Sequence, residues 1–144
     1  MKTAKDLLLE FIASSFREPK VAAAMFAEDG AFEMPYLADF GFPPRYAGHK
    51  EIEDFFQMVR NLYPGFEFSS VTVLIDTPDQ VFAEYEFTAV SSQTGKTIHQ
   101  LFFGRLVAEN GKIKLLREAL NSAEVARAIY QRGIPDLPQK NPTS

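Results

Sequence analysis

Four strand-like segments follow one another in the second half of the chain, at residues 66–75, 80–91, 96–108 and 112–120. Short turn-like sequences separate them, and the last of these, ENGK, contains the Asn-Gly pair that strongly favours a hairpin. The segments therefore predict a meander of four long antiparallel strands. Any helices in the chain must pack against this sheet to cover its apolar face.

Two helices are expected before the sheet. Residues 3–16 carry apolar side chains at helical intervals, and Thr3 and Asp6 have the spacing of a capping box. Pro19 suits the first turn of a second helix, which we expect to continue to Gly30 as its C-terminal cap. The following sequence AFEMPY predicts a short strand.

The centre of the chain predicts a loop and then a third helix. Residues 37–47 are rich in Gly, Pro and aromatic residues, which favours irregular structure and a flap over a cavity. Gly48 opens a helix with one apolar stripe, formed by Ile52, Phe55, Phe56, Val59 and Leu62. After the sheet, Asn121 and Glu124 are expected to cap a final helix over residues 122–132.

Length and composition favour one domain of the α+β class. The chain has 144 residues, and we assign residues 1–132 to the domain and residues 133–144 to a Pro-containing tail. Fourteen Phe and five Tyr are enough to line a cavity, but their number alone does not separate a hollow core from a solid one.

Charge and hydropathy exclude several classes of function. A net charge of −4 without a Lys/Arg cluster argues against a nucleic-acid partner, because phosphate binding needs a basic face. No window approaches a membrane span, and acids interrupt the N-terminal apolar run, so we expect a cytoplasmic protein with no membrane partner. The absence of cysteine fits a reducing compartment and removes thiolate chemistry.

The order of the elements resembles a known superfamily. With YAGHKEIEDFF leading into the third helix and ENGKIKLLREALN forming the last strand, the chain resembles the nuclear transport factor 2-like, or SnoaL-like, α+β roll over residues 3–130. This superfamily includes ketosteroid isomerase-like proteins and small polyketide cyclases. The chain is also similar to phenazine-biosynthesis A/B proteins, through Arg117, Glu118, Asn121 and the sequence GIP at 133–135.

The resemblance implies a curved antiparallel sheet, rolled into a cone and covered by N-terminal helices, with an internal pocket. It also implies a small apolar or cyclic ligand and a homodimer through the outer face of the sheet. We expect no cofactor. The chain has two histidines without ligand spacing, so a histidine-based metal site is not expected either.

Glu118 is the leading candidate for catalysis. Alternation along the strand places its carboxylate on the same face as Leu116 and Leu120, and an inward orientation would raise its pKa into the range useful for proton transfer. The resemblance matches it to a glutamate near the cavity of phenazine-type proteins. A salt bridge or simple exposure at the end of the sheet is the alternative interpretation.

Six further residues are candidate contacts of a substrate. Gln100 is assigned as a hydrogen-bonding group between aromatic side chains, and His49, at a helix start, is a candidate neutral base. The full set comprises Tyr36, His49, Phe56, Gln100, Phe102 and Leu116. His99 lies on the opposite strand face from Gln100, which favours an interface or surface position.

Two acids leave a second arrangement open. Glu84 and Glu86 share the polar face of their strand, which indicates solvation, although an inward polar face would let one of them pair with Glu118. Ketosteroid isomerases use an inward acid as base and a Tyr with a second acid as oxyanion hole. The available tyrosines lie in no matching motif; they are Tyr36, Tyr46, Tyr63 and Tyr85.

Three functions stay open on the sequence. The first is a cofactor-independent isomerase, cyclase or condensation-type enzyme that acts on a hydrophobic cyclic substrate with Glu118 as acid or base. The alternative is a non-catalytic small-molecule binding protein on the same scaffold. The third is an assembly module that works through the outer face of the sheet.

Overall fold

The computed structural model describes residues 1–14 and 17–140 and shows an α+β fold built on one mixed sheet that does not close. The strand order is β2-β1-β6-β5-β4-β3. The strands are β1 (Phe26–Glu33), β2 (Arg45–Ala47), β3 (Glu67–Asp76), β4 (Gln80–Val90), β5 (Thr97–Glu109) and β6 (Lys112–Ala119). The helices are α1 (Ala4–Ser14), α2 (Pro19–Ala24), α3 (His49–Leu62) and α4 (Ser122–Ile129), with 3-10 turns η1 (Pro35–Phe40) and η2 (Ile134–Asp136).

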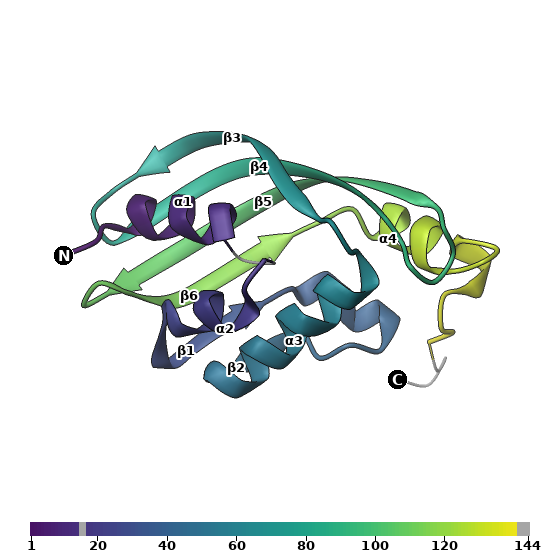
Figure 1. Ribbon diagram of the computed structural model, residues 1–144, viewed down its shortest axis with the longest axis horizontal. Helices are drawn as coiled ribbons and strands as arrows, with labels where there is room; N and C mark the ends of the chain where they lie inside the picture. Colours follow the sequence, from purple (N-terminus) through teal and green to yellow (C-terminus); the bar gives the residue numbers. More distant parts are fainter. Residues whose placement is uncertain (15–16, 141–144) are drawn as a thin grey trace.

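The predicted meander is confirmed. Strands β3 to β6 pair in antiparallel order, each with its neighbour in the sequence, and their bounds fall within about two residues of the predicted ones. The sheet curves around α1, α2 and α3, which lie on its concave side, while α4 lies at one end (Figure 1). This curvature leaves the inner faces of β4, β5 and β6 directed at the helices.

The second predicted helix is wrong beyond Ala24. The chain turns at Met25 and enters β1, which pairs in parallel with β6 and so makes the sheet mixed. Gly30 does not cap a helix: it lies inside β1, where an added Cβ would come within 2.6 Å of the Ile113 carbonyl oxygen. Pairing with β6 therefore overrides the helix propensity of the sequence AAAMFAED.

The loop predicted over residues 37–47 is also partly wrong. Its first residues belong to η1, and Arg45–Ala47 form β2, which pairs with β1 in antiparallel order. The Tyr46 ring of β2 stacks on Phe55 of α3 with 4.2 Å between ring centroids. The C-terminal end of the segment is thus held to both the sheet and α3.

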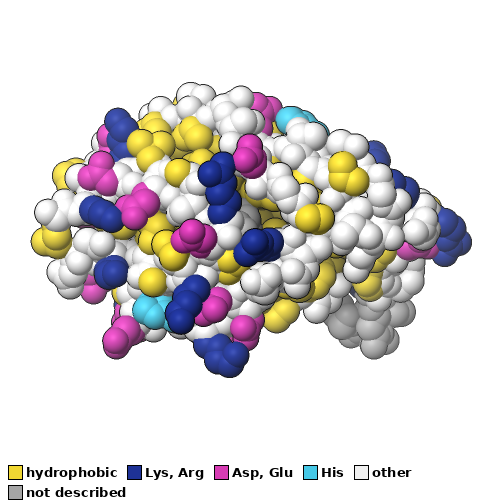
Figure 2. Space-filling model, viewed as in Figure 1, with side chains coloured by type: hydrophobic (Ala, Val, Ile, Leu, Met, Phe, Trp, Pro, Cys, Tyr) yellow, Lys and Arg dark blue, Asp and Glu magenta, His cyan; other side chains and the backbone are white. Residues whose placement is uncertain are grey.

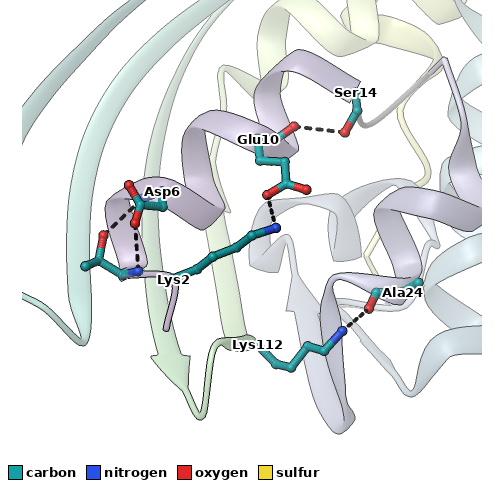
Figure 3. A network of polar contacts seen from close by, with 7 residues as sticks. Lys2, Asp6, Glu10, Ser14, Ala24 and Lys112 are labelled. Atoms are coloured by element: carbon teal, nitrogen blue, oxygen red, sulfur yellow. Dashed lines mark hydrogen bonds and ion pairs between the residues drawn. The ribbon is translucent and has the colours of Figure 1, made fainter.

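The helix starts follow the sequence signals. The Thr3 hydroxyl accepts from the Asp6 N–H, and an Asp6 carboxylate oxygen accepts from the Thr3 N–H, which completes the predicted capping box (Figure 3). The same view shows the Lys112 ammonium donating to the Ala24 carbonyl at the end of α2, at 3.1 Å. Residues 15 and 16 of the predicted first helix lie outside the described residues.

An aromatic core joins the helices to the sheet. Phe11 of α1 and Phe56 of α3 have ring centroids 5.6 Å apart, and both rings contact Phe26 and Phe32 of β1. All four side chains are nearly inaccessible. On the face shown in Figure 2, hydrophobic side chains reach the surface between scattered charged ones.

The last helix begins as predicted and ends early. The Asn121 side chain accepts from the Glu124 N–H, but α4 stops at Ile129 rather than at residue 132. Beyond it, the Lys96 ammonium at the β4–β5 turn donates to the carbonyls of Tyr130 and Gln131, at 2.7 and 2.6 Å. The β4–β5 turn thus fixes the chain that leaves α4.

Candidate functional site

An apolar cavity of about 70 Å³ lies between the concave face of the sheet and the helices. Its walls come from α3, α4, η1 and all the strands except β2. Aromatic and aliphatic side chains dominate, and the polar groups on the lining are Tyr63, Gln100 and Glu118. Glu118 is the one carboxylate that the described residues place on this lining.

Glu118 occupies the position that strand alternation predicts. Leu116 and Glu118 are both buried on the inner face of β6, with Glu118 only 3% exposed, and Leu120 continues that face into the cavity. Arg117, between them, points outward and pairs with Glu33 at 3.1 Å. The Glu118 carboxylate therefore has no salt bridge within the described residues.

Tyr85 is the partner of this carboxylate. Its hydroxyl donates a short hydrogen bond to Oε2 of Glu118, across the inner face from β4 to β6. No described group hydrogen-bonds Oε1. Tyr85 is fully buried, so the pair has one oxygen fixed by the phenol and one oxygen without a partner.

Burial dominates the electrostatics of this pair. Loss of hydration raises the pKa of Glu118 to about 7, and the hydrogen bond from Tyr85 opposes this rise. Burial, together with the neighbouring Glu118 charge, raises the pKa of Tyr85 well above its usual value. Near neutral pH the phenol stays protonated, while both the protonated and the ionised form of the carboxyl group are populated.

Gly104 makes room for the pair. It lies opposite Glu118 on β6 and Ala83 on β4, so the Tyr85 side chain passes over a position without a Cβ. An added Cβ there would come within 2.2 Å of the Tyr85 hydroxyl oxygen. The small residue at this register position is what allows Tyr85 to reach the carboxylate.

Gln100 lies on the cavity wall, but its side chain is hydrogen-bonded to the backbone of Asn121. Its Oε1 accepts from the Asn121 N–H and its Nε2 donates to the Asn121 carbonyl, both at 2.8 Å. The side chain therefore fixes the junction between β6 and α4. Phe102, the next inward residue on β5, does line the cavity beside it.

The other candidate contacts lie elsewhere. Phe56 belongs to the aromatic core and Leu116 lies further along β6, and neither lines the cavity. Tyr36 is 54% exposed on η1. His49 donates from Nε2 to the Phe26 carbonyl oxygen at 2.7 Å, which ties the start of α3 to β1. None of these four side chains lines the cavity that Glu118 faces.

His99 of β5 and the two acids of β4, Glu84 and Glu86, point outward. Nδ1 of His99 lies 3.0 Å from the Thr88 hydroxyl and its Nε2 lies 3.3 Å from a Glu86 oxygen, on the convex face. Glu84 shares this face, because the buried residues of β4 alternate with it. Neither acid pairs with Glu118. The pair of Glu118 with Glu84 or Glu86 that the sequence left open is therefore not formed.

Sequence reasoning missed Tyr85 as the partner of Glu118, although it named the tyrosine. The signal was its place among the apolar inward residues of β4, where a hydroxyl must find a partner. Among the described residues no three His, Cys, Asp or Glu side chains form a group able to hold a metal ion. In the same residues no helix is long and apolar enough to cross a membrane.

A family model for the SnoaL-like domain matches residues 12–116. The chain belongs to the SnoaL-like family. The match covers well over half of the chain and ends two residues before Glu118. None of the curated proteins matches this SnoaL-like sequence.

Solved structures share the SnoaL-like fold. A candidate isomerase from Bacillus subtilis is 25% identical, with a TM-score of 0.77 over 87% of this chain and 91% of its own. A phenazine biosynthesis-related protein from Pseudomonas aeruginosa is 18% identical, with a TM-score of 0.77 over 96% and 88%. A candidate polyketide cyclase from Xanthomonas campestris is 20% identical, with a TM-score of 0.75 over 88% and 96%.

Proposed function

We propose that the protein is a small-molecule enzyme of the isomerase or cyclase type, which moves a proton on a hydrophobic cyclic substrate through Glu118. One observation carries the proposal: a carboxyl group with a pKa of about 7 lies on an apolar cavity and has one oxygen that no described group hydrogen-bonds. A general base works best when its pKa is near the working pH. The names of the B. subtilis and X. campestris structures agree with this class of reaction.

The proposed step uses Glu118 alone as base and acid. Its free Oε1 takes a proton from a carbon next to a carbonyl group, and the protonated carboxyl then returns that proton to another atom of the same substrate. Tyr85 stays protonated throughout, because burial keeps its pKa high, and it holds Oε2 in place. The apolar walls keep water from delivering a competing proton.

The cavity must widen for this reaction. At about 70 Å³ it is smaller than the roughly 150 Å³ cavity that admits benzene in another protein. Met34 and Met58 on the lining are flexible side chains that adapt to irregular shapes. We propose that these two methionines, with Leu37 of η1 and Phe42 just after η1, move aside when a ring enters.

Deuterium exchange tests the proposal without a known substrate. We would incubate cyclohexanone, 2-cyclohexenone, 2-indanone and 1-tetralone in D2O with the protein and follow their α-protons by NMR. The wild type should accelerate exchange of at least one ketone. Glu118→Gln should reduce the rate by about 100-fold or more, while circular dichroism stays unchanged.

The outcomes separate the two leading functions. Wild-type exchange rates in Glu118→Gln would rule out Glu118 as the base. Ketones that bind without any exchange would favour the non-catalytic binding protein. Glu86→Gln, on the convex face beside His99, is the matched control and should leave the exchange rate unchanged.

We also propose a homodimer through the convex face of the sheet. Leu101 and Phe103 are 38% and 40% exposed there, and the Phe103 ring lies parallel to that of Phe82, with 6.5 Å between centroids. Sedimentation should give a dimer that Phe103→Lys disrupts. A wild-type monomer at high concentration would remove the proposal.

A further inference from the structure

A second hollow, of about 520 Å³, opens on the surface where α3 ends. It shares two side chains with the cavity, Tyr63 and Phe66. Tyr63 and Phe66 therefore form a wall that the cavity and the hollow share. A change of their rotamers would join the two spaces.

Among the residues that the structure describes, the Tyr63 hydroxyl in this wall has no hydrogen-bond partner, although the side chain is only 6% exposed. Burial raises the pKa of Tyr63 to about 12, so the group is a neutral donor near neutral pH. A buried hydroxyl that makes no hydrogen bond destabilises the protein. An oxygen atom of a ligand placed against this wall would accept that hydrogen bond.

The rim of the hollow is positive, in contrast to the chain as a whole. Arg60 is exposed and makes no ion pair with any described residue, and Arg17 donates to Glu67 at 2.9 Å. The lining of the hollow thus contains two guanidinium groups and one carboxylate. The C-terminal end of α3 adds about half a negative charge, which is less than the charge of Arg60 alone. Arg60 lies in the last turn of α3 and Tyr63 is the C-cap residue of that helix, and both line the hollow.

We propose that this hollow is the mouth of the cavity and binds the carboxylate end of a ligand whose apolar ring enters the cavity. Arg60 and the Tyr63 hydroxyl donate to the carboxylate, and Arg17 adds positive charge. This inference rests on the proposed function and narrows its substrate class from apolar rings to apolar rings that bear a carboxylate. The chain's net charge of −4 would otherwise repel such a ligand.

A matched pair of probes tests the inference. Phenylacetate and phenylacetamide have the same ring and nearly the same shape but differ in charge. In NMR titrations of the full chain, we expect phenylacetate to bind about tenfold more tightly, because hydrogen bonds to charged groups are the stronger ones. Tyr63→Phe should weaken phenylacetate binding and leave the circular dichroism spectrum unchanged.

Arginine variants locate the effect. Arg60→Gln should bring the affinities for phenylacetate and phenylacetamide close together. Arg105 is an exposed arginine on the other side of the sheet with no ion pair among the described residues, and Arg105→Gln should preserve the preference. Two results would overturn the carboxylate site but leave the proposed function standing. One is equal affinity of the wild type for phenylacetate and phenylacetamide, and the other is an equal loss of the preference in Arg60→Gln and Arg105→Gln. If neither probe binds, the ligand cavity of the proposed function fails with it.

Discussion

At the scale of single residues, the central feature is the Glu118 carboxyl group, which burial keeps close to half ionised near pH 7. Glu118 has lost its hydration and gains one hydrogen bond, from Tyr85. One hydrogen bond does not replace the hydration of a carboxylate, so the charged form is costly. The protein tolerates this cost at a position where a proton acceptor faces an apolar cavity.

The first prediction concerns stability against pH. The pKa of Glu118 is raised from 4.5 to about 7 in the folded protein, so the folded state holds more protons than the unfolded state between these values. Stability contributed by this group is therefore complete below pH 4.5 and falls as pH rises towards 7, by about 3 kcal/mol in total. Asp6, Asp29 and Asp136 have lowered pKa values and act only at lower pH.

Glu118→Gln isolates this contribution, because the amide cannot ionise and still accepts from Tyr85. In urea denaturation, the variant should match the wild type near pH 4.5 and be more stable at pH 8. The gain at pH 8 should be about 3 kcal/mol at most. A difference between the two proteins that does not change with pH would contradict the raised pKa.

Part of the site could be predicted from the sequence at this scale. Period-two alternation was enough to place Glu118 with Leu116 and Leu120 on the inner face. Its bond to Tyr85 was not predictable, because that contact spans two strand pairings and depends on Gly104 lying between them. Gln100 was correctly placed inward, but its use by the Asn121 backbone depends on how β6 joins α4.

At the scale of elements, the close packing of β4 on β5 yields the second prediction. Gly104→Ala should destabilise the protein by about 1 to 3 kcal/mol, because the new methyl group would overlap Tyr85. The nearest overlapping atom is the hydroxyl oxygen, so the same substitution should cost less in a Tyr85→Phe background. Equal costs in both backgrounds would show that Tyr85 is not the obstacle.

The junction between β6 and α4 yields the third prediction. Gln100→Met keeps the size of the side chain but leaves the Asn121 N–H and carbonyl without their partners. Unfolding free energy should fall by about 1 to 3 kcal/mol. Gln57→Met, on the exposed face of α3, is the control and should change it little. A similar small effect at both positions would remove the role assigned to Gln100.

Elements with strong local signals were predictable, and those set by distant pairing were not. The four meander strands, the third helix and the Asn121 cap carry their signals within a few residues. β1 does not, because AAAMFAED favours a helix until β6 is present to pair with it. The three-residue β2 likewise exists only through β1.

At the scale of the whole molecule, the β4–β5 turn closes one end of the cavity. The Thr94 hydroxyl donates to the Ala128 carbonyl, and Lys96 donates to two carbonyls beyond the end of α4. These contacts hold Val125 and Ile129 of α4 against the cavity. The turn and the helix therefore act as one closing element, formed by segments about 30 residues apart in the chain.

The fourth prediction follows from this closure. Lys96→Met should leave the sheet intact but free the end of α4, since a lysine that binds terminal carbonyls stabilises a helix end. Hydrogen exchange should accelerate at the α4 amides and stay unchanged at the β5 and β6 amides. Uniform acceleration over the whole chain would indicate a global loss of stability and contradict a local clamp.

The most direct test of the whole account is the titration of Glu118 itself. In ¹³C NMR of the side-chain carboxyl, the account predicts a midpoint near pH 7, and a higher midpoint in Tyr85→Phe, because the hydrogen bond from Tyr85 lowers the pKa. A wild-type midpoint near 4.5, the ordinary value, would mean that the carboxylate is solvated and would contradict its proposed role as the acid and base of the cavity.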